Sequence, residues 1–341
     1  MDLARTTLTQ QMDTRLRFLE ADVSRSPESF ADVVAEGLSA AQKWLPCRYF
    51  YDEAGSHLFE MICDLPEYYL TRTERAILDT HADAMLKAAG DISALVEFGS
   101  GSGCKTRILL DAAGKNRPNN LSYIPVDISG EFLYNSSRAL MQDYPGLSIT
   151  AIAAEYNDAI SMLPPRSGPR LFLFMGSNVG NFDPCEAASF LARIRSGMHS
   201  EDRLLVGIDL HKHHSHLEPA YDDAAGVTSR FNKNLLKRIN RELGANFDLD
   251  QFDHHAPFVD HHSRIEMRLV SQREQTVRIA ALDRKFTFQP EEYIHTENSH
   301  KYSHAAFSRL ALEAGLAIEN SWTDEREWFA VCLLKPIEAR H

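Results

Sequence analysis

Small, acidic and aromatic residues follow three apolar segments of this sequence, in positions where they could bind a nucleoside. Residues 95–110, LVEFGSGSGCKTRILL, carry three glycines at alternate positions, and glycine lets a backbone approach a ligand closely. Asp127 ends the next apolar segment, and its two oxygens can accept hydrogen bonds from ribose hydroxyls. After a third apolar segment, Glu155 can accept the hydrogens of an adenine amino group while Tyr156 stacks on the ring. The pattern therefore predicts a site for a nucleoside-containing cofactor.

The glycine-rich segment also distinguishes between two kinds of cofactor. Dinucleotide sites use G-x-G-x-x-G, in which a helix N-terminus faces a pyrophosphate. Here Glu97 precedes the first glycine by two residues, in the order E-x-G-x-G-x-G, which is typical of S-adenosylmethionine (SAM) methyltransferases. SAM carries a sulfonium and an amino-acid tail instead of phosphates, so nearby carboxylates are tolerable. We therefore predict a SAM site, with an NAD site or a plain strand-to-helix turn as alternatives.

A second short segment, MGSNVGNF at 175–182, is a candidate for substrate binding. Its small residues would give access to a methyl group in transfer, and Asn181 offers both a donor and an acceptor. The alternative is a helix-capping turn, because NFDP also resembles a helix start.

Apolar segments alternate with helical patterns through the middle of the chain and would position these residues. Strands are expected at 94–98, 122–127, 148–155, 170–176 and 202–210, with helices at 105–113, 130–141 and 186–198. Continuous apolar strands that alternate with helices indicate a parallel sheet covered on both faces. A helix at 305–315 and two further strands predict an antiparallel C-terminal edge. The fold class is thus α/β, a Rossmann-like class I SAM methyltransferase domain, plus a second α+β substrate-binding domain.

The second domain is expected because residues 211–301 are too many for an ordinary loop. They contain a helical pattern at 220–243 and strand patterns at 264–270 and 277–282. The N-terminal residues have no obvious sheet of their own and are expected to pack on this insertion. The prediction is a methyltransferase domain of residues 73–210 and 302–341, and a substrate-binding domain of residues 1–72 and 211–301.

Composition narrows the class of protein further. The 341 residues are 44% hydrophobic and carry 36 Lys plus Arg against 48 Asp plus Glu, for a net charge of −12, so nucleic acid is not an expected partner. No segment approaches the roughly 20 apolar residues of a membrane span, and the N-terminus lacks the apolar run of a signal peptide. The five cysteines form no C-x-x-C pair, and the histidine runs at 211–216, 254–255 and 261–262 fit no metal motif. We expect a cytoplasmic monomer without a functional metal.

The sequence resembles a known family, the L-histidine Nα-methyltransferases of ergothioneine biosynthesis. The resemblance covers nearly the whole chain and is carried by LPEYYLTRTE (65–74), LVEFGSGSGCKT (95–106), GSNVGN (176–181), YDDAAGVTSRFNKNLL (221–236), RIEM (264–267) and TENS (296–299). It implies SAM contacts at Gly99, Lys105, Asp127, Glu155 and Tyr156, where Glu155 replaces an aspartate of the family. It implies substrate contacts at Tyr68, Asn181, Tyr221, Glu297, Asn298 and Ser299, with a side-chain pocket around Met267 and Glu297.

The reaction implied by this resemblance is methyl transfer from SAM to the α-amine of L-histidine, repeated until the trimethylated betaine hercynine forms. Asn181 and Tyr221 would hold the carboxylate and the amine, and Glu297 and Ser299 would bind the two imidazole nitrogens. Tyr68 would reach the ring directly or through water. The alternatives are a related methyltransferase acting on another amino acid or small amine and, as a different class, an NAD-dependent oxidoreductase.

Overall fold

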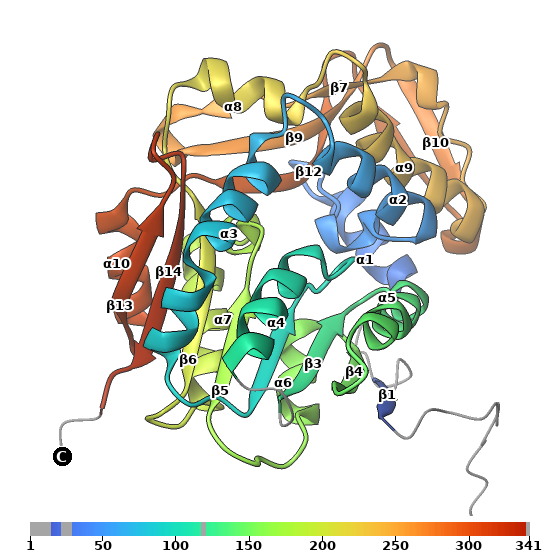
Figure 1. The fold of residues 1–341 in the computed structure, drawn as a ribbon. Coiled ribbons are helices and arrows are strands. Elements are labelled where there is room, and N and C mark those ends of the chain that lie inside the picture. The colour runs from blue at the N-terminus through green and yellow to red at the C-terminus, as the bar shows by residue number, and fades with distance from the viewer. Residues whose placement is uncertain (1–14, 22–28, 117–120, 339–341) are drawn as a thin grey trace, which may run out of the picture.

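A large twisted sheet forms the base of the protein in the computed structural model, which describes residues 15–21, 29–116 and 121–338 (Figure 1). Within these residues the sheet has the strand order β1-β4-β3-β2-β5-β6-β14-β13. Its strands are β1 (Leu16–Glu20), β2 (Ala94–Phe98), β3 (Ser122–Asp127), β4 (Ser148–Ala153), β5 (Arg170–Phe174), β6 (Arg203–Asp209), β13 (Leu316–Thr323) and β14 (Phe329–Pro336).

The first six strands of this order are parallel, and β14 and β13 continue the sheet in antiparallel pairing. This confirms the predicted class I SAM methyltransferase fold, including its antiparallel C-terminal edge. The chain moves from β2 outward to β3 and β4, then returns to the other side of β2 for β5 and β6. Ligands of such sheets bind at the carboxyl ends of the strands where the order reverses, which here is the gap between β2 and β5.

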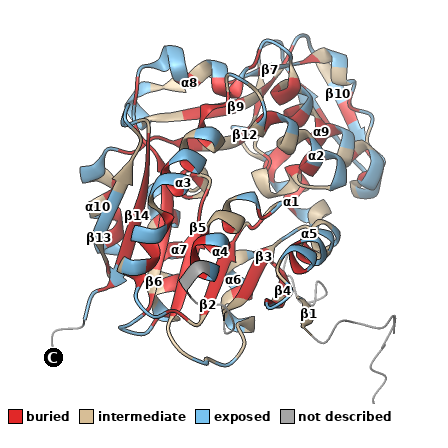
Figure 2. Ribbon diagram, viewed as in Figure 1, coloured by how far each residue is buried: buried red, intermediate tan, exposed pale blue. Residues whose placement is uncertain are grey.

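Helices cover both faces of the sheet, because its central strands are apolar on both sides (Figure 2). Neighbouring residues of β2 point to opposite faces, so Leu95 joins one core cluster and Val96 the other. One face is covered by α3 (Tyr69–Ala89), α4 (Cys104–Asn116) and α5 (Gly130–Asp143), and the other by α6 (Tyr156–Met162), α7 (Pro184–Ser196) and α10 (His304–Glu313).

The edge strand β1 differs from the predicted division of the chain. Residues 1–72 were assigned to the substrate-binding domain, but Leu16–Glu20 pair in parallel with β4 of the large sheet. This strand joins the large sheet because its apolar side chains pack on both faces of that sheet. Leu16 and Phe18 contact the core on one face, and Leu19 contacts the core on the other. For these five residues the assignment is wrong.

The second region lies above the carboxyl ends of the parallel strands in the view of Figure 1. Its main sheet has the order β12-β9-β7, with β8 also pairing β9, and a separate hairpin joins β10 and β11. The elements are α1 (Phe30–Ser39), α2 (Glu53–Cys63), α8 (His214–Tyr221), α9 (Val227–Leu243), β7 (Phe252–His255), β8 (Phe258–Val259), β9 (Arg264–Ser271), β10 (Gln275–Ile279), β11 (Arg284–Phe288) and β12 (Tyr293–His300). The domain boundaries proposed from the sequence otherwise remain a proposal.

The helical pattern predicted at 220–243 is two helices with a turn between them. Gly226 adopts a left-handed conformation with φ of +67°, and the carboxylate of Asp223 accepts hydrogen bonds from the backbone N–H groups of Val227 and Thr228 at 2.9 and 2.7 Å. These contacts start α9 afresh. Tyr221 consequently ends α8 instead of lying inside a long helix.

The two regions meet where β12 leaves the small sheet. Tyr302 donates its backbone N–H to the carbonyl of Asp209 at 2.9 Å, which joins the end of β12 to the end of β6. The short 3₁₀ helix Asn178–Asn181, which follows β5, also packs on β12. The site must therefore lie between β12 and the carboxyl ends of the parallel strands. Within the described ranges, no helix has the length and apolar character needed to cross a bilayer.

Candidate active site

The loop after β2 needs glycine for its conformation. Gly99, Gly101 and Gly103 have φ values of +73°, +50° and +70°, a region that side chains with a Cβ rarely occupy. At Gly99 a Cβ would also lie 2.6 Å from the Tyr156 hydroxyl and 2.9 Å from the amide nitrogen of Asn178. The loop thus brings its backbone to the reversal point of the sheet.

Two side chains beside this loop have polar atoms suited to a ligand. The Asp127 carboxylate accepts hydrogen bonds from the backbone N–H groups of Gly101 and Ser129, each at 3.1 Å. Burial raises the pKa of Asp127, and these hydrogen bonds act in the opposite direction. The hydroxyl of Ser100 is buried and has no hydrogen-bond partner among the described residues. A buried hydroxyl without a partner is costly, so both groups favour a polar ligand here.

Several of the residues predicted to bind the substrate lie on β12. Glu297 lies opposite Met267 of β9 in the strand register, so the two side chains share one face. Ser299 follows on that face and its hydroxyl lies 2.7 Å from the hydroxyl of Tyr221. Asn298 turns the other way, toward His295 at 2.8 Å. The structure thus brings Met267, Glu297 and Ser299 together but directs the Asn298 side chain away from them.

Two other predicted substrate residues approach the same face of β12. The Tyr68 ring packs edge-on against the Tyr221 ring, with 6.0 Å between their centroids. Asn181 is half-buried at the end of its 3₁₀ helix. That helix contacts β12 so closely that a Cβ at Gly180 would lie 2.8 Å from the carbonyl oxygen of His300. The structure therefore gathers these tyrosine and asparagine side chains around one strand.

Glu297 is the unusual group of this cluster. Its half-buried carboxylate makes no hydrogen bond or ion pair with any residue that the structure describes. Burial raises the pKa of Glu297 to about 7, although the Lys301 ammonium lowers it. Besides burial, the Glu297 charge contributes to the raised pKa values of Cys47 and Tyr51. Both residues therefore lie close to it, and sequence reasoning missed both because no motif or spacing connects them to residue 297.

Comparison with known proteins identifies the family. The family described as "Histidine-specific methyltransferase, SAM-dependent" matches residues 30–336. Histidine N-alpha-methyltransferase of Mycolicibacterium smegmatis is 42% identical over 316 residues, which cover 93% of this chain and 97% of that protein. The chain belongs to the histidine-specific SAM-dependent methyltransferase family.

More distant relatives show how far this methyltransferase family extends. Ergothioneine biosynthesis protein 1 of Schizosaccharomyces pombe is 30% identical over 83% of this chain, which spans 37% of that longer protein. L-tryptophan methyltransferase of Psilocybe serbica is 28% identical over 94% of this chain and 95% of its own length. Relatives of this chain are therefore named for different amino-acid substrates, histidine and tryptophan.

Family membership makes SAM the methyl donor, and Lys105 is one of the residues predicted to contact it. Its ammonium is 2.6 Å from Glu74, which is fully buried on α3. The Glu74 carboxylate also accepts the backbone N–H of Gly176, at 2.8 and 2.9 Å to its two oxygens. Burial alone would lower the pKa of Lys105, but Glu74 raises it above its usual value. Glu74 thus holds a charged lysine between the loops after β2 and β5.

The residues expected to bind adenine have other contacts in this methyltransferase. Glu155 is exposed and lies 3.3 Å from the guanidinium of Arg48. Tyr156 is half-buried with its ring edge-on to Phe98 and Phe174, at centroid distances of 5.9 and 5.6 Å. Part of the Tyr156 ring is therefore committed to the core, and the adenine contacts of both residues remain predictions.

Glu97, which distinguished the loop from a dinucleotide motif, points into the protein. Its buried carboxyl group accepts hydrogen bonds from Thr106 of α4 and Tyr123 of β3. Burial raises its pKa to about 7. Glu97 therefore anchors α4 to β2 and β3 behind the loop.

Replacing Asp127 with alanine is expected to weaken S-adenosylhomocysteine binding by about tenfold or more, since hydrogen bonds to a charged group contribute roughly 1.5–3 kcal/mol. Calorimetry of the product complex measures this directly. Asp158→Ala is the control, because Asp158 is an exposed acid on α6. Equal affinity of wild type and Asp127→Ala would remove Asp127 from the cofactor site.

Glu297 should also make stability depend on pH. Its pKa is about 7 in the folded protein and 4.5 ordinarily, so the unfolded chain binds fewer protons between these values and stability falls as pH rises through them. Glu297→Gln should therefore raise Tm above pH 7, with no gain near pH 4.5. Glu292→Gln is the control and should lower Tm above pH 7, because burial raises the Glu292 pKa but Lys43 and the backbone N–H of Gln289 together lower it more. A lower Tm for Glu297→Gln above pH 7 would contradict this account.

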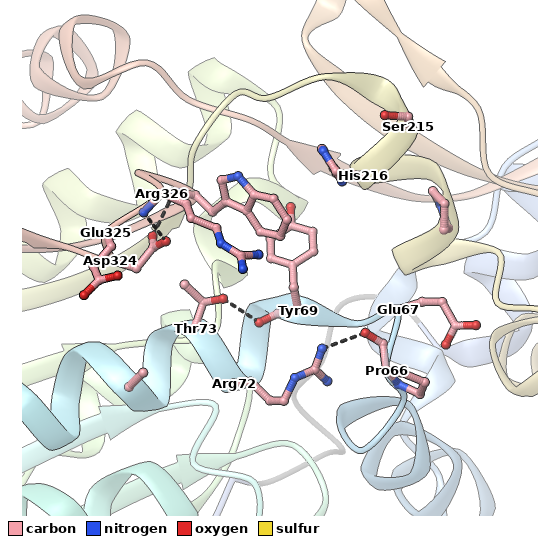
Figure 3. A pocket seen from close by; sticks show the side chains of 13 residues that line it. Pro66, Glu67, Tyr69, Arg72, Thr73, Ser215, His216, Asp324, Glu325 and Arg326 are labelled. Carbon is pink, nitrogen blue, oxygen red and sulfur yellow. Dashed lines mark hydrogen bonds between the residues drawn. The ribbon is translucent and has the colours of Figure 1, made fainter.

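A surface pocket of about 570 Å³ lies outside this site, between the start of α3, α8 and the turn before β14 (Figure 3). None of the predicted site residues lines it. Two of its polar groups are already bonded within the protein: Arg72 donates to the carbonyl of Pro66 at 2.7 Å, and Asp324 accepts the backbone N–H of Trp328 at 2.8 Å. The pocket is thus separate from the residues gathered at β12.

Proposed function

We propose that the protein transfers methyl groups from SAM to the α-amino group of L-histidine and forms hercynine for ergothioneine biosynthesis. The observation that carries this proposal is the Glu297 carboxylate, which lacks a partner on the face of β12 that also holds Ser299. An imidazole N–H supplies the partner that a half-buried carboxylate needs. The near full-length identity of 42% to a histidine enzyme supports the same substrate.

Each part of histidine meets a group of matching chemistry in the gathered residues. Asn181 has a donor for the carboxylate and an acceptor for the amine, and the hydrogen-bonded hydroxyls of Tyr221 and Ser299 offer a further donor to the carboxylate or to a ring nitrogen. Glu297 binds an imidazole N–H, and Tyr68 borders the ring. When bound, SAM would supply a methyl group on a sulfonium. A neutral α-amine held by these residues would form a bond to that methyl carbon, and the sulfur would leave as the neutral thioether of S-adenosylhomocysteine. Holding the amine in line contributes roughly 7–11 kcal/mol in well-oriented reactions, and its released proton passes to water between rounds.

A related activity on another amino acid is the second candidate, since a tryptophan methyltransferase is 28% identical to this chain. The distinguishing feature is again Glu297, because an apolar side chain would leave its carboxylate unpaired and the indole N–H of tryptophan would reach it only with a larger ring fitted against Met267. Membership in a SAM-dependent family removes the NAD-dependent alternative.

The test is mass spectrometry of the standard amino acids after incubation with the protein and SAM. Histidine should gain methyl groups up to the trimethylated product, while the other amino acids remain unmodified. Faster methylation of any other amino acid would overturn the proposal. We further propose that the protein is cytoplasmic, because all five cysteines are free thiols, as a reducing compartment keeps them, and that it acts as a monomer. Light scattering of the purified protein tests the monomer.

A further inference from the structure

Lys301, directly after β12, is a buried cation to which the sequence assigned no role. Its side chain is fully buried. The ammonium lies 2.8 Å from Asp209 of β6, 2.9 Å from the Tyr221 hydroxyl and 2.7 Å from the Ser299 hydroxyl. An ammonium has three hydrogens to donate and no lone pair. All three are therefore used, one on a carboxylate and two on the hydroxyls proposed to bind the substrate.

The two hydroxyls consequently have a fixed number of hydrogens to offer. Both oxygens accept from Lys301, and 2.7 Å separates them, so one hydroxyl hydrogen lies between Tyr221 and Ser299. Burial raises the pKa of Tyr221, although Lys301 acts against it, so the phenol keeps its hydrogen. The second hydroxyl hydrogen has no acceptor among the described residues. The pair can donate one hydrogen bond outward, and it does so beside a positive charge.

A second lysine shares the same carboxylate but not the hydroxyls. Lys212 lies 2.5 Å from Asp209 and 2.8 Å from the Tyr69 hydroxyl, on the side away from Ser299. Burial lowers the pKa of Lys212 to about 8. For Lys301 burial acts in the same direction, but the Asp209 charge raises its pKa above the usual value. Lys301 therefore stays charged, and Lys212 is a matched buried lysine without a contact to the Tyr221 or Ser299 hydroxyl.

We propose that Lys301 is a positioning residue: by donating to both hydroxyls it makes the Tyr221 and Ser299 pair a donor of one hydrogen bond to an acceptor atom of the amino-acid substrate. This inference rests on the proposed function and names the polarity of that contact. The acceptor is a carboxylate oxygen or an unprotonated ring nitrogen of histidine. Both atoms have a lone pair that can accept a hydrogen bond, and neither carries a positive charge. A cationic imidazolium is disfavoured at this position, because its hydrogens would face the pair's donor and the Lys301 charge.

The first experiment compares Lys301→Met with Lys212→Met. We expect Lys301→Met to raise the KM for histidine by about tenfold or more, the usual effect of a hydrogen bond to a charged group, with the affinity for S-adenosylhomocysteine unchanged. Lys212→Met should lower Tm to a similar extent while the KM stays close to wild type. Equal KM values for the two variants would overturn the proposal. If the wild-type protein itself does not methylate histidine, the proposed function is wrong, whatever the variants show.

A double-mutant cycle separates positioning from general stability. Lys301→Met should raise the KM far less in a Ser299→Ala, Tyr221→Phe background than in wild type, since no hydroxyl is then left to position. If Lys301→Met does not fold, the variants that remove the two hydroxyls test the proposal without it. Ser299→Ala and Tyr221→Phe should each leave one outward donor, so the double variant should lose more than the sum of the two single losses. Additive losses would contradict the conclusion that the Tyr221 and Ser299 pair donates one hydrogen bond to the substrate.

The source of the acceptor is read with L-histidinamide and with histamine in place of histidine. If the pair donates to the carboxylate, the KM penalty of Lys301→Met persists with the amide, whose carbonyl oxygen still accepts, but disappears with histamine, which keeps the amine and the imidazole and has no carbonyl group. If it donates to a ring nitrogen, the penalty persists with both substitutes. Either result supports the positioning role, and absence of a penalty with histidine contradicts it.

Discussion

Replacing Glu297 with alanine is expected to reduce the preference for histidine over tryptophan by a factor on the order of 10² to 10⁴, because sites that pair a buried polar group reject analogues that cannot pair it by about 10⁴–10⁵. The Glu297 carboxylate makes no bond within the described protein. Histidine would supply a partner through its imidazole N–H. The indole of tryptophan also has an N–H, but we expect Met267 on the facing strand to keep this larger ring from bringing it to the carboxylate. The measurement is the ratio of kcat/KM values for the two amino acids in wild type and variant.

The control for this prediction is Glu292→Ala, just before the start of β12. That carboxylate pairs with Lys43 and lies outside the proposed site, so its loss should leave the ratio unchanged. Met267→Ala in the Glu297→Ala background should increase turnover of tryptophan further by enlarging the space opposite residue 297. A constant ratio in Glu297→Ala would remove Glu297 from the site and with it the main structural argument for histidine.

Most of the large sheet could be predicted because buried parallel strands have continuous apolar sequences. The bounds of β2 and β3 match the predicted segments, and the structure confirms the antiparallel C-terminal edge. The strand predicted at 148–155 extends too far: β4 ends at Ala153, and Glu155 caps α6. An apolar run does not reveal where the ladder hydrogen bonds stop. β1 was missed as part of this sheet because its partner lies more than a hundred residues away in sequence.

Candidate site residues could be predicted where they lie in a recognisable sequence motif. The directions in which their side chains point could not be predicted. The side chains of Asn298 and Ser299 are adjacent in sequence, yet they point to opposite faces of β12, and a register shift between His295 and Glu297 fixes which one faces Tyr221. A one-residue shift exchanges the two faces of a strand. Glu74 and Lys301 were missed as site residues for another reason. Both act through partners distant in sequence, Lys105 for one and Tyr221 for the other.

Opposite ends of one 3₁₀ helix should control different ligands, and Asn181 and Asn178 provide the matched pair. The Asn178 amide lies beside Gly99 and Gly176, on the cofactor side, whereas Asn181 lies next to β12. Asn181→Ala is expected to raise the KM for histidine by roughly 10- to 100-fold, because a hydrogen bond to the charged carboxylate is lost. Its affinity for S-adenosylhomocysteine should stay within about twofold of wild type, since such ligand contacts are local.

Asn178→Ala should show the reverse pattern, with weaker S-adenosylhomocysteine binding and a histidine KM close to wild type at saturating SAM. The comparison controls for damage to the helix itself, because both substitutions remove the same side chain from the same four residues. Calorimetry with S-adenosylhomocysteine and initial rates with histidine measure the two affinities separately. If Asn181→Ala lost both affinities equally, Asn181 would be a residue that supports the loop after β5, and the proposed contact with the amino-acid carboxylate would be wrong.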